Sequence, residues 1–321
     1  MARRLTKKQH ERISNKKVEQ IDALKNLDPD ALFKGRVIAQ HGPHLMVEDE
    51  AHTLYQANIR QNLPTIVCGD YVYCTFENEI PVVLQLIERT NELARVSYGQ
   101  RKKLIAANLD QIFIVIAPKP EPSPSLIDRY LIAIKAFDIP MGIIINKSDM
   151  IDEQSDFSFI EEYQQAFDIE ILFTSQNDPE SIATLQAALM GKTSIFVGQS
   201  GVGKSSLTNA VIPNLSLQTQ RISATTGLGN HTTSATTLYY LNDHQGALID
   251  SPGVRSFNVD HLTIESIHNG FPDVVRFTRQ CKFSNCNHLQ DPGCAVAQAI
   301  EENLLSERRV DSYLQILRSS G

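Results

Sequence analysis

The segment from Gly198 to Ser205 carries the residue types that a phosphate-binding loop requires. It matches the pattern G-x-x-x-x-G-K-S, between the apolar run Ser194–Val197 and a predicted helix over Ser205–Val211. Its glycines let backbone N–H groups curl around a phosphate at a helix N-terminus. The lysine would reach the β- and γ-phosphates, and the serine would ligate Mg²⁺. We therefore predict a nucleoside triphosphate site formed by Gly198, Gln199, Ser200, Gly201, Val202, Gly203, Lys204 and Ser205.

A second group of residues is suited to choosing the base. Asn146, Lys147, Ser148 and Asp149 follow a predicted strand, at the end where α/β sheets bind ligands. The Asp149 carboxylate can accept hydrogen bonds from N1–H and the 2-amino group of guanine, whereas adenine would leave the carboxylate unpaired at a cost. The motif predicts guanine specificity. Ser175 follows the next strand and is expected to place a backbone N–H near guanine O6, unless it is an ordinary strand end.

Two later segments offer groups for the γ-phosphate and its metal ion. Asp250-Ser-Pro-Gly253 follows a predicted strand; Asp250 suits a water-mediated Mg²⁺ contact, and the Gly253 N–H suits the γ-phosphate. The loop sequence around His231 ends in two threonines, of which Thr233 is the preferred Mg²⁺ ligand beside Ser205 and Thr232 is the alternative.

The order of these motifs is permuted. The guanine motif (146–149) and Ser175 precede the phosphate loop, and the Asp250–Gly253 segment comes last, so the chain predicts a circularly permuted P-loop GTPase domain. Val254 stands where Ras-like enzymes carry the glutamine that orients water. We expect slow hydrolysis by the chain alone, with His231 as the catalytic group that positions water together with Lys204 and Thr233. A backbone group or a group supplied in trans is the alternative to His231.

Three cysteines and one histidine lie within a short segment near the C-terminus. They follow the spacing Cys-x4-Cys-x-His-x5-Cys, a closed tetrahedral donor set typical of structural Zn²⁺. Unrelated free cysteines are the alternative. The predicted ligands of one structural Zn²⁺ are Cys281, Cys286, His288 and Cys294.

The elements around these motifs predict three kinds of structure. Five short strands punctuated by glycine, proline and asparagine favour a small all-β OB-fold barrel. Strands and helices then alternate, which predicts an α/β unit with a mostly parallel sheet. A basic connector spans Arg89–Lys103, a long loop is expected over Ser223–Thr237, and a polar helical segment encloses the cysteines. The predicted barrel strands are 33–40, 44–48, 53–59, 70–76 and 82–87; the predicted domains are a basic arm (1–32), the OB-fold (33–90), the permuted GTPase domain (91–262) and the zinc-binding helical domain (263–321).

Composition excludes several classes of protein. The chain has 321 residues, 42% hydrophobic and 21% charged, as ordinary globular proteins do. No apolar run approaches the roughly 18 residues of a membrane span, and the charged N-terminus lacks the apolar core of a secretory signal. Five cysteines without a leader favour the reducing cytoplasm. Residues 1–20 have a net charge of +5, and the remainder of the chain has −12. The basic arm either contacts a polyanionic partner at this end of the protein or is a solvated tail.

Taken together, these motifs resemble one family, the small-subunit-dependent RsgA/YjeQ GTPases. The phrases GQSGVGKSSL, GLGNHTT, DSPGVR and DPGCAV carry the resemblance. It implies a monomeric bacterial cytoplasmic factor that binds the 30S ribosomal subunit and 16S rRNA late in subunit maturation. It also implies GTP hydrolysis that is stimulated by the subunit and drives release. The competing hypotheses are an RNA-binding protein that holds GTP as a static ligand, and a permuted GTPase acting on the 50S subunit or on tRNA.

Overall fold

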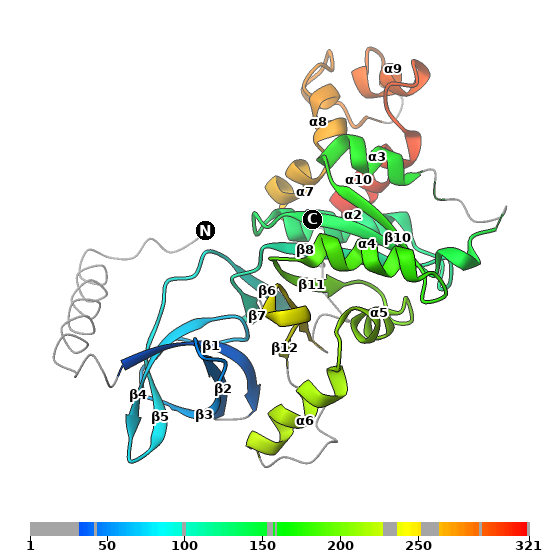
Figure 1. The fold of residues 1–321 in the computed structure, drawn as a ribbon. Helices are drawn as coiled ribbons and strands as arrows, with labels where there is room; N and C mark the ends of the chain where they lie inside the picture. The colour runs from blue at the N-terminus through cyan, green and yellow to red at the C-terminus, as the bar shows by residue number, and fades with distance from the viewer. Residues whose placement is uncertain are drawn as a thin grey trace, which may run out of the picture.

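The first five strands of the computed structural model close into a barrel (Figure 1). The structure describes residues 32–41, 44–97, 101–152, 157, 159–226, 236–251, 263–288 and 291–319. The barrel strands are β1 (Leu32–His41), β2 (His44–Asp49), β3 (Leu54–Ile59), β4 (Tyr71–Glu77) and β5 (Ile80–Leu86). They pair in the order β1-β2-β3-β5-β4, and β4 pairs again with β1. The predicted OB-like barrel is therefore confirmed.

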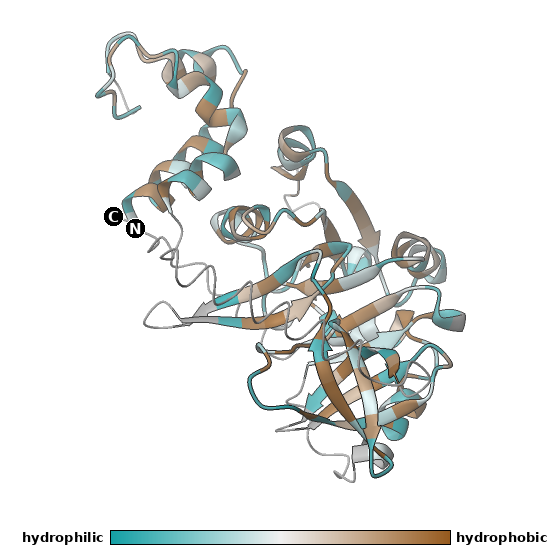
Figure 2. Ribbon diagram, turned by 90° about the vertical axis from the view of Figure 1, so that its left-hand side faces the viewer, coloured by the Kyte–Doolittle hydropathy of each residue, from teal (hydrophilic) through white to brown (hydrophobic). Residues whose placement is uncertain are grey.

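Alternation along the barrel strands places small and branched apolar side chains inside. Val37, Val47, Val72 and Val83 are fully buried in one cluster. Gly35 is needed on β1 because a Cβ there would lie 2.2 Å from Cγ1 of Val47. Figure 2 shows brown, hydrophobic stretches along many strands and teal, hydrophilic stretches along many of the connections. The barrel thus follows directly from the two-residue period of its strands.

The basic connector predicted over Arg89–Lys103 is instead a hairpin of β6 (Glu92–Ser97) and β7 (Arg101–Ala107). Tertiary hydrogen bonds hold it. Asn108 Oδ1 accepts from the Thr90 N–H at 2.9 Å, and Asn108 Nδ2 donates to the Gly69 carbonyl at 3.0 Å. The apolar residues of these strands do not alternate regularly with polar ones, so the hairpin leaves only a weak local pattern.

A mixed sheet follows, in the order β10-β9-β8-β11-β13-β12. Its strands are β8 (Gln111–Ile116), β9 (Met141–Asn146), β10 (Glu170–Thr174), β11 (Thr193–Val197), β12 (Thr237–Tyr240) and β13 (Ala247–Asp250). All neighbouring pairs are parallel except β12 with β13. Ala39 of β1 pairs with Thr237 of β12 and joins the barrel to this sheet.

Helices cover both faces of the sheet. Successive side chains of β8 point to opposite faces and all are buried, so both faces must be covered. Ile112 and Ile114 pack with residues of α2 (Pro124–Lys135) and α3 (Phe159–Phe167). Phe113 and Val115 pack on the other face with α4 (Pro179–Leu189) and α5 (Lys204–Val211). The predicted α/β class is confirmed, and the layers leave the carboxyl ends of the parallel strands open at one edge.

Helix α6 (Leu215–Thr226) and strand β12 lie between α5 and β13 in the chain. The sequence pattern predicts a loop over Ser223–Thr237, but α6 continues to Thr226 and β12 begins at Thr237, so this prediction is wrong at both ends. Gln218 explains the local order, because Nε2 donates to the Tyr240 carbonyl at 2.9 Å and Oε1 accepts from the Tyr240 N–H at 3.0 Å.

Within the residues that the structure describes, the C-terminal part consists of helices and projects from the sheet next to α2 (Figure 1). They are α7 (Ile264–Gly270), α8 (Pro272–Thr278), α9 (Ala295–Glu301) and α10 (Glu307–Ser319). Ile132 of α2 belongs to their core, and a Cβ on Gly270 would lie 2.2 Å from Ile132 Cγ1. Among the helices of the described residues, none is both long enough and apolar enough to cross a membrane.

Candidate functional site

The predicted phosphate loop turns sharply between β11 and α5. Gly198, Gly201 and Gly203 have φ values of 140°, 88° and 97°, which other residues rarely adopt. Glycine at 198 also permits a close approach, because a Cβ there would lie 2.3 Å from the Val115 carbonyl oxygen. The loop therefore has the backbone course that turns N–H groups toward a phosphate at the start of α5.

Lys204 begins α5 and folds back over the loop. Its Nζ donates to the carbonyl oxygens of Gly198 and Gln199, both at 2.6 Å. Ser200 and Ser205 are exposed beside it, whereas Val202 is buried and anchors the loop in the core. The ammonium group is thus held where phosphate oxygens would replace the carbonyl oxygens as its partners.

The guanine motif contacts the phosphate loop directly. Asn146 ends β9, and its Nδ2 donates to the Val202 carbonyl at 2.8 Å. Lys147 has φ of 58°, and its Nζ donates to the carbonyls of Gly201 and Lys119 at 2.8 and 2.7 Å. A Cβ on Gly203 would lie 2.3 Å from Asn146 Nδ2. The base-recognition and phosphate-binding segments therefore form one site at the carboxyl edge of the sheet.

Asp149 is placed by the segment that follows β10. Ser175 Oγ donates to Asp149 Oδ1 at 2.6 Å, and Asn177 Nδ2 donates to Oδ2 at 2.9 Å. These hydrogen bonds, that of Ser175 first, lower the pKa of Asp149. The carboxylate is therefore ionised and oriented, with lone pairs left to accept hydrogen bonds from a base.

Three partners in this site were not predicted from the sequence: Lys119, Gln176 and Asn177. Gln176 Nε2 donates to the Ser206 carbonyl on α5 at 3.1 Å, which ties the Ser175 segment to the phosphate-loop helix. The only sequence signal for Gln176 and Asn177 is their place in the segment Thr-Ser-Gln-Asn, which follows a strand. Their side-chain amides can donate or accept hydrogen bonds there.

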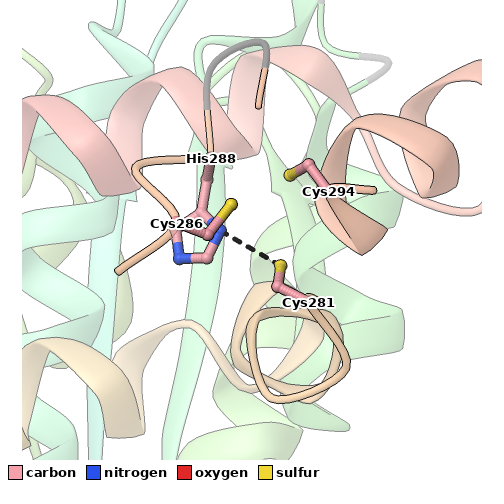
Figure 3. A group of neighbouring side chains, drawn as sticks. All are labelled: Cys281, Cys286, His288 and Cys294. Atoms are coloured by element: carbon pink, nitrogen blue, oxygen red, sulfur yellow. Dashed lines mark hydrogen bonds between the residues drawn. The ribbon is translucent and has the colours of Figure 1, made fainter. Parts of the chain in front are cut away.

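The four predicted zinc ligands gather in the C-terminal part (Figure 3). Their ligand atoms all lie within 4.8 Å of one another, and Cys281 Sγ lies 3.5 Å from His288 Nδ1. Cys281 follows α8, and Cys294 is the N-cap of α9, where its Sγ accepts from the Ala297 N–H at 3.4 Å. Two helix ends and the loop carrying Cys286 thus direct one imidazole nitrogen and three sulfurs toward a common point.

The protonation of this cluster fits metal binding. Burial lowers the pKa of His288, which favours the neutral imidazole that ligates metals. Desolvation and the neighbouring thiols of Cys294 and Cys281 raise the pKa of Cys286 to about 12, so a cation is needed to hold these sulfurs as thiolates. Asp291 supports the loop by accepting from the Asn287 N–H at 2.8 Å. The donor set suits a soft or borderline metal ion.

The sequence profile of the RsgA GTPase family matches residues 86–260. This chain belongs to the RsgA GTPase family. A relative from Histophilus somni (strain 129Pt), "Small ribosomal subunit biogenesis GTPase RsgA", is 39% identical over 89% of this chain and 83% of its own length. A relative of the same name from Haemophilus influenzae (strain PittGG) is 38% identical over 99% of this chain and 95% of its own length.

Solved structures of this kind have the same fold. YjeQ from Thermotoga maritima aligns with a TM-score of 0.70 and 29% identity, over 90% of this chain and 98% of that protein. YloQ, described as a circularly permuted GTPase, aligns with a TM-score of 0.64 and 30% identity, over 90% of this chain and 95% of that protein. The permutation predicted from the motif order and the resemblance to the RsgA GTPase family are both confirmed.

The predicted residues around the γ-phosphate are only partly within the described chain. Asp250 ends β13, which runs beside β11 with Ile249 opposite Ile195, so Asp250 lies at the edge of the sheet where the phosphate loop starts. His231, Thr232, Thr233 and Gly253 lie outside the described residues. Their roles in this RsgA family member stay predictions.

Proposed function

We propose that this protein is a GTPase that binds the small (30S) ribosomal subunit and acts late in its maturation. It hydrolyses GTP to GDP and phosphate when it binds the subunit, and hydrolysis drives its release. The names of the relatives from Histophilus and Haemophilus support the subunit as partner. The observation that carries the nucleotide assignment is the contact between the guanine motif and the phosphate loop through Asn146 and Lys147.

Recognition of GTP is divided between two parts of one edge. Asp149, held by Ser175 and Asn177, accepts from N1–H and the 2-amino group of guanine, while Lys147 lies along the path toward the phosphates. Backbone N–H groups of residues 198–205 and the ammonium of Lys204 bind the phosphates. Because the two parts contact each other, the protein binds the base and the phosphates of one nucleotide in a single site.

Hydrolysis needs groups that the sequence supplies around this edge. Ser205, Thr233 and Asp250 would hold Mg²⁺, which neutralises charge on the β- and γ-phosphates. The Gly253 N–H would donate to the γ-phosphate. His231 would position the attacking water once Thr233 is engaged, because only one residue separates them. A partner that places His231 and Thr233 against the nucleotide would then accelerate hydrolysis.

The metal held by the cysteines is one structural Zn²⁺. Three thiols and one imidazole close a tetrahedral site with no open position for catalysis. The metal therefore contributes folding energy to the small C-terminal helices rather than chemistry. Cys281, Cys286, His288 and Cys294 are its ligands.

We infer a chain of four parts, of which the third holds the nucleotide site. We take residues 1–32, 33–90, 91–262 and 263–321 as basic arm, OB-fold, permuted GTPase domain and zinc-binding domain. The protein would act as a cytoplasmic monomer that contacts 16S rRNA. Asp250 and Gly253 precede α7 in the sequence, and α7 packs near Ile132 of α2. A conformational change that depends on the bound nucleotide can therefore be transmitted along the chain to the C-terminal helices.

GTP turnover with and without purified 30S subunits tests this function. Full-length protein is measured alone, with 30S subunits, with 50S subunits and with tRNA. We expect slow turnover alone and stimulation by 30S subunits only. Equal turnover in all four conditions would favour a static GTP ligand, and stimulation by 50S subunits or tRNA would move the function to another RNA.

The same assay tests His231. His231→Ala should keep GTP and 30S binding but lose stimulated turnover on the order of 10²-fold, as expected for a group that positions water. His268→Ala, which removes an imidazole from α7, is the matched control and should leave stimulation unchanged. Full stimulation of the His231 variant would assign the water to a backbone group or an rRNA group in trans.

A further inference from the structure

A second group of metal-binding side chains lies at the junction of the barrel and the mixed sheet. Among the described residues, Glu48, His52 and His244 bring one carboxylate and two imidazoles together, with all ligand atoms within 4.8 Å of one another. Glu48 lies in β2, His52 in the turn that precedes β3, and His244 in the turn between β12 and β13. Residues from two separate parts of the chain thus meet at one point.

The spacing of these atoms is close to that of a metal site. His52 Nδ1 lies 3.5 Å from Glu48 Oε2. Ligand atoms at about 2.0–2.1 Å from a tetrahedral metal are about 3.3 Å apart, so this pair already has a chelating separation. The rings of His52 and His244 stack with centroids 3.7 Å apart and planes at 25°. The ligand nitrogen of His244 lies within 4.8 Å of the ligand atoms of Glu48 and His52, so metal binding requires its ring to turn toward them.

The surroundings hold the carboxylate in place. Glu48 is only 4% exposed, and Arg221 Nη1 lies 3.8 Å from Oε1, the oxygen that does not face His52. Arg221 also donates to the carbonyl of His52, and the ring of Tyr240 lies 4.2 Å from that of His244. Such outer partners orient metal ligands. Because the guanidinium adds a positive charge, we expect weaker binding than at the four-ligand cysteine cluster.

A cavity beside the cluster leaves room for further ligands. Its volume is about 330 Å³, and Glu48, Arg221, Tyr240 and His244 line it. Water can therefore complete the coordination shell, as it does in three-ligand zinc sites. Residues 218, 221 and 222 of α6 form another part of the wall. The site is open to solvent-borne ions, in contrast to the closed cysteine cluster.

We propose that Glu48, His52 and His244 bind a divalent transition metal ion, with Zn²⁺ as the species that this donor set favours. Imidazole and carboxylate ligands together suit Zn²⁺, Ni²⁺ and Cu²⁺ rather than Mg²⁺. The strand pairing between β1 and β12 is limited, within the described residues, to Ala39 and Thr237. A shared metal therefore clamps the barrel to the mixed sheet beside α6, whose end precedes the segment with His231 and Thr233.

Metal counting on the full-length protein tests the proposal. Protein that retains its cysteine-bound metal is dialysed against excess Zn²⁺, and bound zinc is measured by mass spectrometry. We expect a second equivalent in the wild type, its loss in His52→Ala and in His244→Ala, and its retention in the control His268→Ala. Added Zn²⁺ should also raise the melting temperature of the wild type and the control but not of the two variants.

Two further measurements distinguish the second site from the cysteine cluster and from a loss of folding. Co²⁺ taken up at the second site should give absorption without the sulfur-to-cobalt charge-transfer bands of the cysteine cluster. If circular dichroism shows that a histidine variant is unfolded, Glu48→Gln decides in its place, because the amide keeps the shape but lacks the charge. A single equivalent in the wild type, or a second equivalent that survives in folded His52→Ala or Glu48→Gln protein, would overturn the proposal.

Discussion

Arg309 on α10 should be the residue whose loss separates the C-terminal helices from the rest of the protein. Its guanidinium is 1% exposed and pairs with the fully buried carboxylate of Asp128 on α2. Nε and Nη2 donate to Asp273 at 2.9 and 2.8 Å, and the guanidinium lies 4.3 Å from the Phe271 ring centroid. One side chain therefore neutralises carboxylates on both sides of the contact between α2 and the C-terminal helices.

The magnitude follows from what the variant Arg309→Ala leaves behind. Burial raises the pKa of Asp128, and the charge of Arg309 opposes that shift. Removing one partner of a buried ion pair costs about 3–5 kcal/mol, and Asp128 would stay buried with only the more distant Arg308, whose Nη1 lies 4.0 Å from Oδ2. Arg60 in the barrel is the control. Its side chain is 50% exposed and pairs with Glu77, which is 49% exposed, so Arg60→Ala should cost at most about 1 kcal/mol.

The deficit should depend on pH with a definite sign. Without Arg309, the pKa of Asp128 in the folded protein rises further above its unfolded value. Such a group contributes stability that is present below the unfolded pKa and is lost as pH rises through the folded pKa. The free energy difference between wild type and Arg309→Ala should therefore be small in acid and grow toward neutral pH. Adding Asp128→Asn to Arg309→Ala should recover part of the loss at neutral pH.

Urea unfolding followed by far-ultraviolet circular dichroism measures this, since the chain contains no tryptophan for fluorescence. Hydrogen exchange of α2 and α10 shows whether the loss is local to their contact. The reasoning is refuted if Arg309→Ala costs no more than Arg60→Ala, or if its deficit is the same in acid and at neutral pH.

Two other predictions concern the sites themselves. Asp149→Asn should weaken GTP binding on the order of 10²-fold and favour xanthosine nucleotides, because an amide donates where the carboxylate accepts; calorimetry with both nucleotides checks this, and unchanged GTP affinity would contradict the guanine assignment. Purified protein should carry about one tightly bound Zn²⁺, and Cys286→Ser should lose it and unfold the C-terminal helices while GTP binding persists; metal analysis and near-ultraviolet circular dichroism check this, and a folded, metal-free wild type would count against it.

Features whose physical requirements are local could be predicted from the sequence. The glycines at 198, 201 and 203 are required by positive φ values within a single turn. The cysteine cluster depends on one short spacing, and the barrel strands depend on the alternation of neighbouring residues. The ends of β9 and β11 could be located because each apolar run stops at a motif. For the phosphate loop, the guanine motif and the four metal ligands, the sequence therefore indicated both which residues could do the chemistry and where they lie in the fold.

Features that depend on a distant partner were decided by the tertiary structure. Helix α6 and strand β12 are held together by the Gln218 amide, and nothing in the polar sequence of α6 shows that Tyr240 lies beside it. Asn177 supports Asp149 only because β9 and β10 are neighbours in the sheet. Arg309 appears in the sequence as one charge among many, yet it is buried because α2 passes next to α10. A hydrogen bond or ion pair needs two groups within a few ångströms, and only the packing of the layers determines which groups of a long chain meet.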